Sequence, residues 1–478
     1  MASLLEPRPY QRAIVDGRAT ARALALFLEQ GLGKTKVVLD MANFLWEHGE
    51  IRGLVVISKK SVVSNWFYEE LDKNLGPSDH DKQLYLTERK NKILPVAAIR
   101  GREPLQVLLM NEGCVRTDHG LKYLEQFIAA FDTLLVVDES TIIKGPTSQI
   151  TKALTKVGRY AAYRRILCGE PAPQGPVDYF SQYRFLDPEI LGVKTFTAFK
   201  SMYVKQKSIW INGRQIVTPT REFADGMQEE FERRVRPYTI RLRKADVLPD
   251  LPKKQYVKVA FELSPWVRGR YEKLRKEYFT ELTADGDQKT LTAPMAISRI
   301  TRLHQLVNDR FIADDGTVHS EDSGRKEALF TLLDGRPAGA KTIVWAHYRS
   351  NIEELGVVLA DRYGAVSVLM GGMSDSERQD ELNKFRKHGT ILVANPATAG
   401  WGLTLTEADT AIYFTNSYNW EHRAQSEDRI HRIGQESSSV TYYDLVAANT
   451  IDEKILEVLT DKADFSQSVF RDFAEWIS

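Results

Sequence analysis

The sequence predicts an α/β protein with two lobes, each built on a parallel sheet. Its 478 residues exceed what a single hydrophobic core usually organises, so two or three domains are expected. Short apolar runs alternate with helical patterns in the first part of the chain, and the same alternation returns after residue 341. Continuous apolar strands separated by helices are typical of parallel sheets that are buried on both faces.

The first lobe is expected to begin with a strand, a glycine-rich turn and a helix. The strand is predicted at 23–27 and the helix at about 34–46. A second strand and helix follow, and two further apolar runs complete the sheet; these are predicted at 53–58, 62–71, 133–137 and 165–168.

The pattern breaks after about residue 185. Within this stretch, Asn212-Gly213 separates two β-rich runs in the segment Ser208–Pro219. Asn-Gly favours a type I′ turn, because both central residues need positive φ, so this segment is predicted to be a β-hairpin. A parallel sheet does not require such a hairpin. We therefore interpret it as an insertion that projects from the first lobe.

The second lobe repeats the architecture, with strands predicted at 341–346, 365–369, 390–394 and 410–414. Helices are expected at about 350–363, 374–387 and from 451 onward. The predicted organisation is a first lobe over residues 1–255, with an insertion at about 186–245. A mostly helical linker over 256–333 and a second lobe over 334–478 follow.

Composition is that of a globular chain, with 43% hydrophobic and 27% charged residues. The net charge of +1 does not itself indicate nucleic-acid binding, so positive charge would have to gather in a cleft. Cys114 and Cys168 are too few for a disulfide framework and are expected to be buried thiols. The N-terminus lacks the pattern of a secretory signal, and no apolar run has membrane-spanning length. We expect a cytoplasmic protein, or a host-cytoplasmic one if a phage encodes it.

A phosphate-binding loop is predicted between the first strand and the first long helix. The segment reads Leu28-Glu29-Gln30-Gly31-Leu32-Gly33-Lys34-Thr35. Glycines let backbone N–H groups turn toward phosphate oxygens, and the helix N-terminus adds its positive dipole end. Lys34 would pair with the β- and γ-phosphates, and Thr35 would coordinate Mg²⁺. A glycine turn without ligand is the alternative, and Leu28 departs from the glycine of the strict motif.

An acidic pair ends the apolar strand at 133–137. Asp138 and Glu139 would lie at the carboxyl edge of the sheet, where open α/β folds bind ligands. Asp138 would hold Mg²⁺ and Glu139 would act as general base toward the attacking water. A solvated turn is the alternative for the pair alone, but the nearby phosphate loop favours the catalytic interpretation.

These motifs resemble the superfamily-two helicases, and among them the SWI/SNF-type ATPases. Pro7–Gln11 is similar to the adenine-reading segment, with Gln11 as the base contact. Gly31–Thr35 resembles the nucleotide loop, and Asp138-Glu139 the DEAD/DEAH-like pair. The resemblance extends to the stretch from Leu54 to Trp66, to Gly169-Glu170-Pro171 and to the lobe junction at Asp246–Pro252. It implies two RecA-like lobes that bind ATP and Mg²⁺.

The second lobe carries the most specific resemblance. The segment Gln425–Gln435 is similar to helicase motif VI almost letter for letter, and Ala399–Thr406 resembles motif V. The resemblance implies nucleotide contacts for Gly402 and Gln425. Arg429 and Arg432 are three residues apart, so on a helix they would share a face and reach the γ-phosphate across the interlobe cleft. An arginine finger contributes about 10³–10⁵ in rate.

Three departures from the family pattern concern coupling. Ser140-Thr141 replaces the usual Ala-His or Ala-Asp, Glu170 replaces a threonine, and Asn395-Pro396 opens motif V differently. Hydrolysis is expected to survive, because both carboxylates are kept. The transmission of DNA binding to ATP hydrolysis is expected to be tuned differently.

DNA contacts are expected at the phosphate backbone, with little sequence specificity. The candidates, each of which could equally be an ordinary surface residue, are Lys59, Lys60, Ser61, Asn65, Arg349, Thr398 and Gly400. On the hairpin, Trp210 is a candidate for stacking on a base or wedging a junction, and the flanking Arg214 is a further candidate for DNA contact. Stacking is worth about 1–3 kcal/mol per base. The alternative is that Trp210 packs the hairpin onto the lobe.

The sequence as a whole predicts a monomeric, DNA-stimulated ATP hydrolase that translocates on duplex or branched DNA, with branch migration or fork remodelling as the functional analogy. One alternative is a DNA-tracking motor that displaces a protein partner. Another is a nucleotide-gated binding module without translocation, although Lys34, Glu139, Arg429 and Arg432 argue against it. An RNA helicase is a further alternative.

Overall fold

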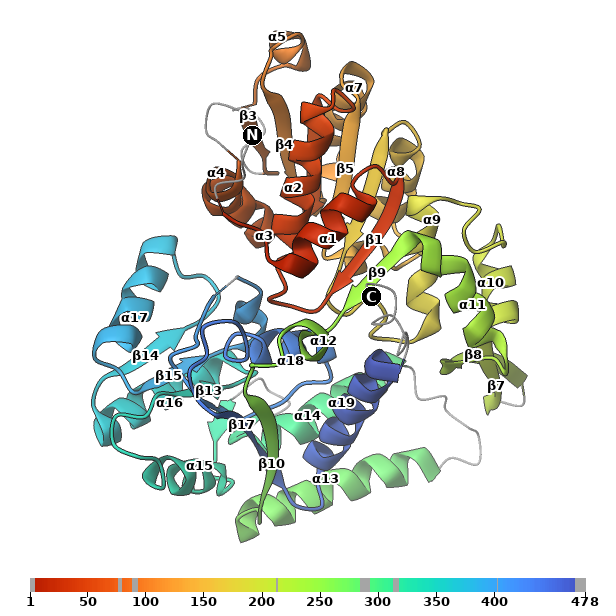
Figure 1. The fold of residues 1–478 in the computed structure, drawn as a ribbon. Coiled ribbons are helices and arrows are strands. Elements are labelled where there is room, and N and C mark those ends of the chain that lie inside the picture. Colours follow the sequence, from red (N-terminus) through yellow and green to blue (C-terminus); the bar gives the residue numbers. More distant parts are fainter. Residues whose placement is uncertain are drawn as a thin grey trace. The chain divides into compact units, whose positions relative to one another are not determined.

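The computed structural model describes residues 5–75, 80–87, 93–211, 214–283, 293–312, 318–401 and 403–468. The chain divides into two compact units, the first formed mainly by residues 1–249 and the second mainly by residues 250–463. Each unit contains one large parallel sheet covered by helices on both faces (Figure 1). The two-lobed α/β fold predicted from the sequence is therefore confirmed.

The first unit contains a seven-stranded parallel sheet in the order β3-β4-β2-β5-β6-β1-β9. All the strand pairs are parallel, which requires a crossover between consecutive strands. The strands are β1 (Ala23–Leu28), β2 (Gly53–Ser58), β3 (His80–Tyr85), β4 (Leu105–Asn111), β5 (Thr133–Asp138), β6 (Tyr163–Leu167) and β9 (Thr239–Leu242).

Alternate residues of these strands enter two separate cores. Leu24, Leu26 and Leu28 of β1 face a core shared with α1 (Pro9–Arg18), α2 (Lys34–Glu47) and the segment made of α3 (Lys60–Asn65), the π-helix η1 (Trp66–Glu70) and α4 (Leu71–Asn74). Ala25 and Phe27 face the opposite core. The helices on that side are α6 (Glu112–Val115), α7 (Asp118–Ala130), α8 (Gln149–Gly158), α9 (Tyr179–Leu186), α10 (Phe196–Tyr203) and α11 (Met227–Val235).

The second unit contains a six-stranded parallel sheet in the order β10-β17-β16-β13-β15-β14. Its strands are β10 (Lys253–Phe261), β13 (Thr342–Trp345), β14 (Val366–Leu369), β15 (Ile391–Ala394), β16 (Thr410–Tyr413) and β17 (Ser439–Ala447). The helices α15 (Arg325–Asp334) and α16 (Arg349–Tyr363) pack on one face, and α17 (Asp375–Lys387) on the other.

A smaller core joins the remaining helices of the second unit to the end of β17. It contains Val267 and Tyr271 of α13 (Pro265–Thr283) and Leu306 of α14 (Ala293–Leu306). The short antiparallel pair β11 (Arg310–Ile312) and β12 (Val318–Ser320) follows. Two further helices of this unit are α18 (Trp420–Glu427), which follows β16, and α19 (Ile451–Ser468), which follows β17.

Side-chain caps explain where several helices begin. Thr117 accepts a hydrogen bond from Gly120 N at the start of α7, and Ser148 accepts one from Thr151 N at α8. At α17, Ser374 and Glu377 form a reciprocal capping box. Each cap satisfies a backbone donor that has no partner within its helix.

Two segments that the sequence assigned to an insertion and to a linker contain strands of the large sheets. The predicted insertion at 186–245 contains β9, which pairs with β1 at the edge of the first sheet. The predicted linker at 256–333 contains most of β10, which pairs with β17 along nine residues and is thereby part of the second sheet. Both strands mix apolar with charged residues, so they lack the continuous apolar run of a central parallel strand.

The predicted hairpin consists of β7 (Val204–Ile211) and β8 (Arg214–Phe223), which form a two-stranded sheet of their own. Thr220 Oγ1 donates to Lys205 O at 2.8 Å, and Lys205 pairs with Glu222 at 2.8 Å. The Asn212-Gly213 turn lies outside the described residues, as do the side chains of Trp210 and Arg214.

Cys114 and Cys168 are buried and form no disulfide, as expected. Among the helices that the structure describes, none combines the length and apolar character needed to cross a membrane.

Candidate nucleotide and nucleic-acid sites

The predicted phosphate loop connects the carboxyl end of β1 to the first turn of α2. Gly31 has φ of 87° and Gly33 has φ of 74°, values in the left-handed region that favours glycine. Gly33 is the N-cap of α2, and Lys34 and Thr35 occupy the first helical positions. Lys34 Nζ donates to Leu28 O at 3.0 Å, which folds the lysine back over the loop. The loop therefore presents a helix N-terminus and an ammonium group on the same side.

Gln11 lies against this loop, although twenty residues separate the two segments. Its Nε2 donates to Leu32 O at 3.0 Å, and its Oε1 accepts from Arg8 N at 2.9 Å. Tyr10 OH also donates to Leu32 O at 3.0 Å. A Cβ atom on Gly33 would stand 2.4 Å from Gln11 Nε2. The predicted adenine-reading residue is thus packed tightly onto the phosphate loop.

The acidic pair lies at the carboxyl end of β5, two strands from β1. Asp138 is buried, and both of its oxygens accept hydrogen bonds at 2.9 Å, Oδ1 from Glu139 N and Oδ2 from Trp66 Nε1. Burial raises the pKa of Asp138, while Lys34 and the Trp66 hydrogen bond act in the opposite direction. Trp66 belongs to the π-helix η1, and sequence reasoning did not assign it this role.

Glu139 adopts a left-handed backbone conformation, with φ of 53° and ψ of 59°. Such a conformation is uncommon outside glycine, asparagine and aspartate and needs support from its surroundings. Gln30 Nε2 of the phosphate loop donates to Glu139 Oε1 at 3.5 Å. A Cβ on Gly169 would lie 3.0 Å from Gln30 Cγ and 3.6 Å from Lys34 Nζ. Three segments, at 30–35, 138–139 and 169–171, therefore meet at one edge of the sheet.

The first-unit candidates for DNA contact lie just after β2. Lys59 is the N-cap of α3, and Lys60, Ser61 and Asn65 lie within that helix. Lys60 is exposed, whereas Lys59 and Asn65 are half-buried. The side chain of Ser61 lies outside the described set. The three described side chains share one short helix that follows the carboxyl end of a central strand.

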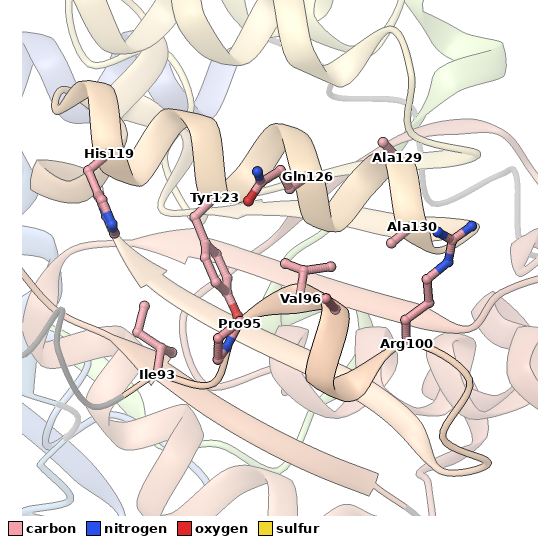
Figure 2. A pocket seen from close by; sticks show the side chains of 10 residues that line it. Ile93, Pro95, Val96, Arg100, His119, Tyr123, Gln126, Ala129 and Ala130 are labelled. Carbon is pink, nitrogen blue, oxygen red and sulfur yellow. The ribbon is translucent and has the colours of Figure 1, made fainter.

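A separate hollow of about 690 Å³ lies between α5 (Val96–Ile99) and α7 (Figure 2). Tyr123 crosses it and donates its hydroxyl to Leu94 O at 2.7 Å. None of the predicted site residues lines it. Its walls are Ile93, Pro95, Val96, Ala97, Arg100, His119, Tyr123, Gln126, Ala129 and Ala130.

In the second unit, the segment after β15 is the 3₁₀ helix η6 (Pro396–Trp401), which contains Thr398 and Gly400. Thr398 is buried, and its hydroxyl donates to Asn395 O at 2.5 Å, so this candidate for DNA contact serves the local turn. Arg349 begins α16, is exposed and pairs with Glu353 at 2.8 Å. Gly402 lies outside the described residues.

The arginines of motif VI are not on a helix, in contrast to the sequence prediction. Helix α18 ends at Glu427, and Arg429 and Arg432 lie in the irregular turns that follow. Both guanidinium groups nevertheless converge, because Nη1 of each donates to Leu403 O at 3.4 Å. Arg432 Nη1 also donates to Thr404 Oγ1 at 3.0 Å. Gln425 is buried within α18.

Motif VI is held by a buried ionic network that sequence reasoning missed. Glu427 accepts hydrogen bonds from Arg423 Nε at 2.8 Å, Lys254 Nζ at 3.1 Å and Tyr256 OH at 2.7 Å. Burial opposes ionisation of Glu427, but Lys254 and Arg423 keep its pKa below the usual value. Arg423 also pairs with Asp444 of β17. The network ties the residues just before the two arginines to β10 and β17.

Comparison with known proteins identifies the family. The SNF2-related domain matches residues 15–312, and the helicase conserved C-terminal domain matches residues 324–434. The chain belongs to the SNF2-related family. The two matched regions include the phosphate loop, the acidic pair and most of motif VI.

Curated relatives of this SNF2-related chain are much longer than it is. A protein of Mycoplasma pneumoniae, named an uncharacterized ATP-dependent helicase, is 25% identical over 91% of this chain and 39% of its own length. The DNA annealing helicase and endonuclease ZRANB3 of Mus musculus is 27% identical over 92% of this chain and 38% of its own length. The chain thus spans under two fifths of the length of these relatives. The SWI2/SNF2 ATPase core of Sulfolobus solfataricus in complex with double-stranded DNA aligns over 99% of this chain and 96% of its own, with 24% identity and a TM-score of 0.45.

One departure of this SNF2-related chain has a structural counterpart. Ser140 is completely buried and donates its hydroxyl to Gln182 Oε1 of α9 at 2.6 Å. Burial raises the pKa of Tyr179 on the same helix, with Arg241 acting to lower that pKa and Glu170 acting to raise it. The Ser140 hydroxyl thus links the turn that carries the acidic pair to α9. No local pattern in the sequence predicts this hydrogen bond.

Proposed function

We propose that this chain is an ATP-driven motor that moves along DNA. The observation that carries the proposal is the meeting of Gln30, Lys34, Asp138 and Glu139 at one edge of the first sheet. A phosphate-binding cation, a buried carboxylate and a second carboxylate next to it are the groups that ATP hydrolysis needs. Membership of the SNF2-related family and the helicase names of its relatives support this function.

The residues of the first unit fit a magnesium ion that arrives with the nucleotide. Mg²⁺ usually binds through one or two carboxylates together with substrate phosphates and waters. Asp138 offers a carboxylate and Thr35 a hydroxyl on the phosphate-loop helix. In the part of the chain that the structure describes, no three His, Cys, Asp or Glu residues are grouped to hold a metal by themselves. Bound Mg²⁺ would neutralise charge that develops on the phosphate oxygens.

In the proposed reaction, Lys34 binds the β- and γ-phosphates, and Glu139 accepts a proton from the attacking water. Gln30 orients the Glu139 carboxylate. Arg429 and Arg432 stabilise the γ-phosphate charge when nucleotide brings the two units to the active arrangement, so that hydrolysis is coupled to a movement. Lys59, Lys60 and Asn65 contact the DNA backbone, and such contacts carry no sequence information.

The preferred DNA is proposed to be duplex or branched. One relative is named a DNA annealing helicase, which favours a branched or partly unwound substrate over RNA. Branch migration or fork remodelling is the specific task that we propose for the motor.

The test is ATP hydrolysis without nucleic acid and with single-stranded DNA, duplex DNA, a four-way junction and RNA, each at two salt concentrations. Stimulation by duplex or junction that weakens with salt is expected, because neutralised phosphates release counterions. The Glu139→Gln variant should bind ATP without hydrolysing it. Equal rates in every mixture, abolished by Glu139→Gln, would instead indicate an ATPase that a protein partner triggers. Absence of hydrolysis with intact ATP binding would support a nucleotide-gated binding module.

A further inference from the structure

The side chain of Gln182 on α9 is fully buried, and its amide makes three hydrogen bonds. Both N–H donors and the carbonyl oxygen have partners. Its Oε1 accepts from Ser140 Oγ at 2.6 Å, and its Nε2 donates to Pro171 O at 2.6 Å and to Asp178 O at 2.8 Å. A buried amide with satisfied donors is rigid, because breaking any of the bonds leaves an unpaired polar group. The side chain thus fixes the separation between the residues it joins.

The first of these residues adjoins the proposed general base. Ser140 is the first residue of η3 (Ser140–Ile143), and Glu139 is the N-cap of that short helix. The left-handed conformation of Glu139 is held between β5, which is anchored by Ser58 Oγ donating to Asp138 O at 2.8 Å, and the buried Ser140. Fixing the Ser140 side chain therefore fixes the turn that carries the Glu139 carboxylate.

The second of these residues adjoins the phosphate loop. Pro171 belongs to the segment 169–171, in which Gly169 packs against Gln30 and Lys34. Gln30 in turn donates to Glu139. The contacts close a ring that runs from Glu139 through Ser140, Gln182, Pro171 and Gly169 to Gln30 and back to Glu139.

We propose that Gln182 is a positioning residue for ATP hydrolysis, which sets Glu139 relative to the phosphate loop by joining Ser140 to Pro171. The proposal rests on the proposed ATPase function and adds a residue that touches neither nucleotide nor metal. Gln182 acts on the step in which Glu139 orients the attacking water. The hydrogen bonds of its amide go to Ser140, Pro171 and Asp178 rather than to Lys34 or Gln11, so the affinity for ATP should change little when Gln182 is replaced.

Gln182→Leu should therefore lower kcat by about 10- to 100-fold, the scale of an ångström-sized misplacement, and leave KM for ATP within about twofold. Ser140→Ala, which removes a single oxygen, should also lower kcat. Ser181→Ala is the matched control. Ser181 is a buried neighbour on α9 whose hydroxyl has no hydrogen-bond partner among the described residues, so this change should leave kcat unaltered.

The double variant Ser140→Ala with Gln182→Leu separates positioning from stability. In Gln182→Leu the buried Ser140 hydroxyl is left without its acceptor, and the double variant removes that unpaired hydroxyl, so it should regain part of the thermal stability that Gln182→Leu loses. Its kcat should stay as low as that of Gln182→Leu. If kcat returned together with the melting temperature, Gln182 would be a structural residue and the proposal would be wrong.

The variants are measured as full chains with saturating duplex DNA, and their folding is checked by thermal melting. If Gln182→Leu does not fold, Ser140→Ala alone decides, because an unchanged kcat in that variant overturns the proposal. Wild-type protein without any ATP hydrolysis would overturn the proposed function and this role together. Full hydrolysis in wild type and in Gln182→Leu would overturn this role alone.

Discussion

At the scale of single residues, His304 shows how burial controls protonation. Its ring lies in the second unit, with Nδ1 2.7 Å from Tyr348 OH and Nε2 3.8 Å from Asp452 Oδ1. Burial lowers the pKa of His304 to about 4, although the Asp452 carboxylate acts in the opposite direction. The folded protein therefore holds this imidazole neutral at a pH at which an unfolded chain would protonate it.

The free energy of unfolding should consequently fall as the pH falls from about 6.5 to about 4. In that range His304 binds a proton in the unfolded state but not in the folded state. The free energy of unfolding therefore falls by about 1.4 kcal/mol per pH unit, or about 3 kcal/mol in total. Urea denaturation followed by tryptophan fluorescence across this range measures the slope. His304→Gln should flatten it relative to wild type, and identical slopes in both proteins would contradict the assignment.

Local motifs allowed the sequence to predict the residues of the phosphate loop, but not the residues that support them. Lys34 and Glu139 are recognisable because each follows an apolar strand at a short fixed distance. Trp66 and Gln182 contact the Asp138–Ser140 turn from 72 and 42 residues away along the chain. No periodicity or spacing encodes such contacts, since they depend on how the helices pack onto the sheet.

At the scale of elements, the central strands were predictable and the peripheral ones were not. The strands β1, β2, β5 and β13 are continuous apolar runs, because helices cover both of their faces. In contrast, β10 has only exposed and half-buried residues along its length. Its place in the second sheet follows only from its pairing with β17. The arginine turn after α18 was likewise missed, since three-residue spacing alone does not distinguish a helix from successive turns.

The edge strand β10 also carries a prediction, because it brings Lys254 and Tyr256 to the buried carboxylate of Glu427. Glu427→Ala should destabilise the second unit by about 3–5 kcal/mol, since it leaves the buried cation Arg423 and the neighbouring Lys254 without one of their shared counter-charges. Tyr256→Phe should cost only about 1 kcal/mol, the net worth of a single hydrogen bond. Urea titration and limited proteolysis measure both variants. Equal stability of the two would show that the ionic network contributes little.

At the scale of the whole molecule, the chain consists of two units with separate sheets and separate cores. The phosphate loop and acidic pair belong to the first unit, and Arg429 and Arg432 belong to the second. Contacts within each unit hold the functional groups of that unit in place. The proposed hydrolysis requires groups from both, which a single substitution in the second unit can test.

Arg432→Gln should reduce kcat for ATP by about 10³-fold, the lower end of the contribution of an arginine finger, and leave the affinity for a non-hydrolysable ATP analogue within a few-fold. Its contacts with Leu403 O and Thr404 are long or partly exposed, so little stability should be lost. Arg362→Gln is the control, because this exposed arginine of the same unit pairs with Asp334 at 2.6 Å and lies over the Phe330 ring, neither of which is a predicted site residue. Steady-state hydrolysis and analogue titration distinguish the two variants. If Arg432→Gln hydrolysed ATP at the rate of Arg362→Gln, Arg432 would have no part in hydrolysis, and the coupling of ATP turnover to movement would have to depend on other residues.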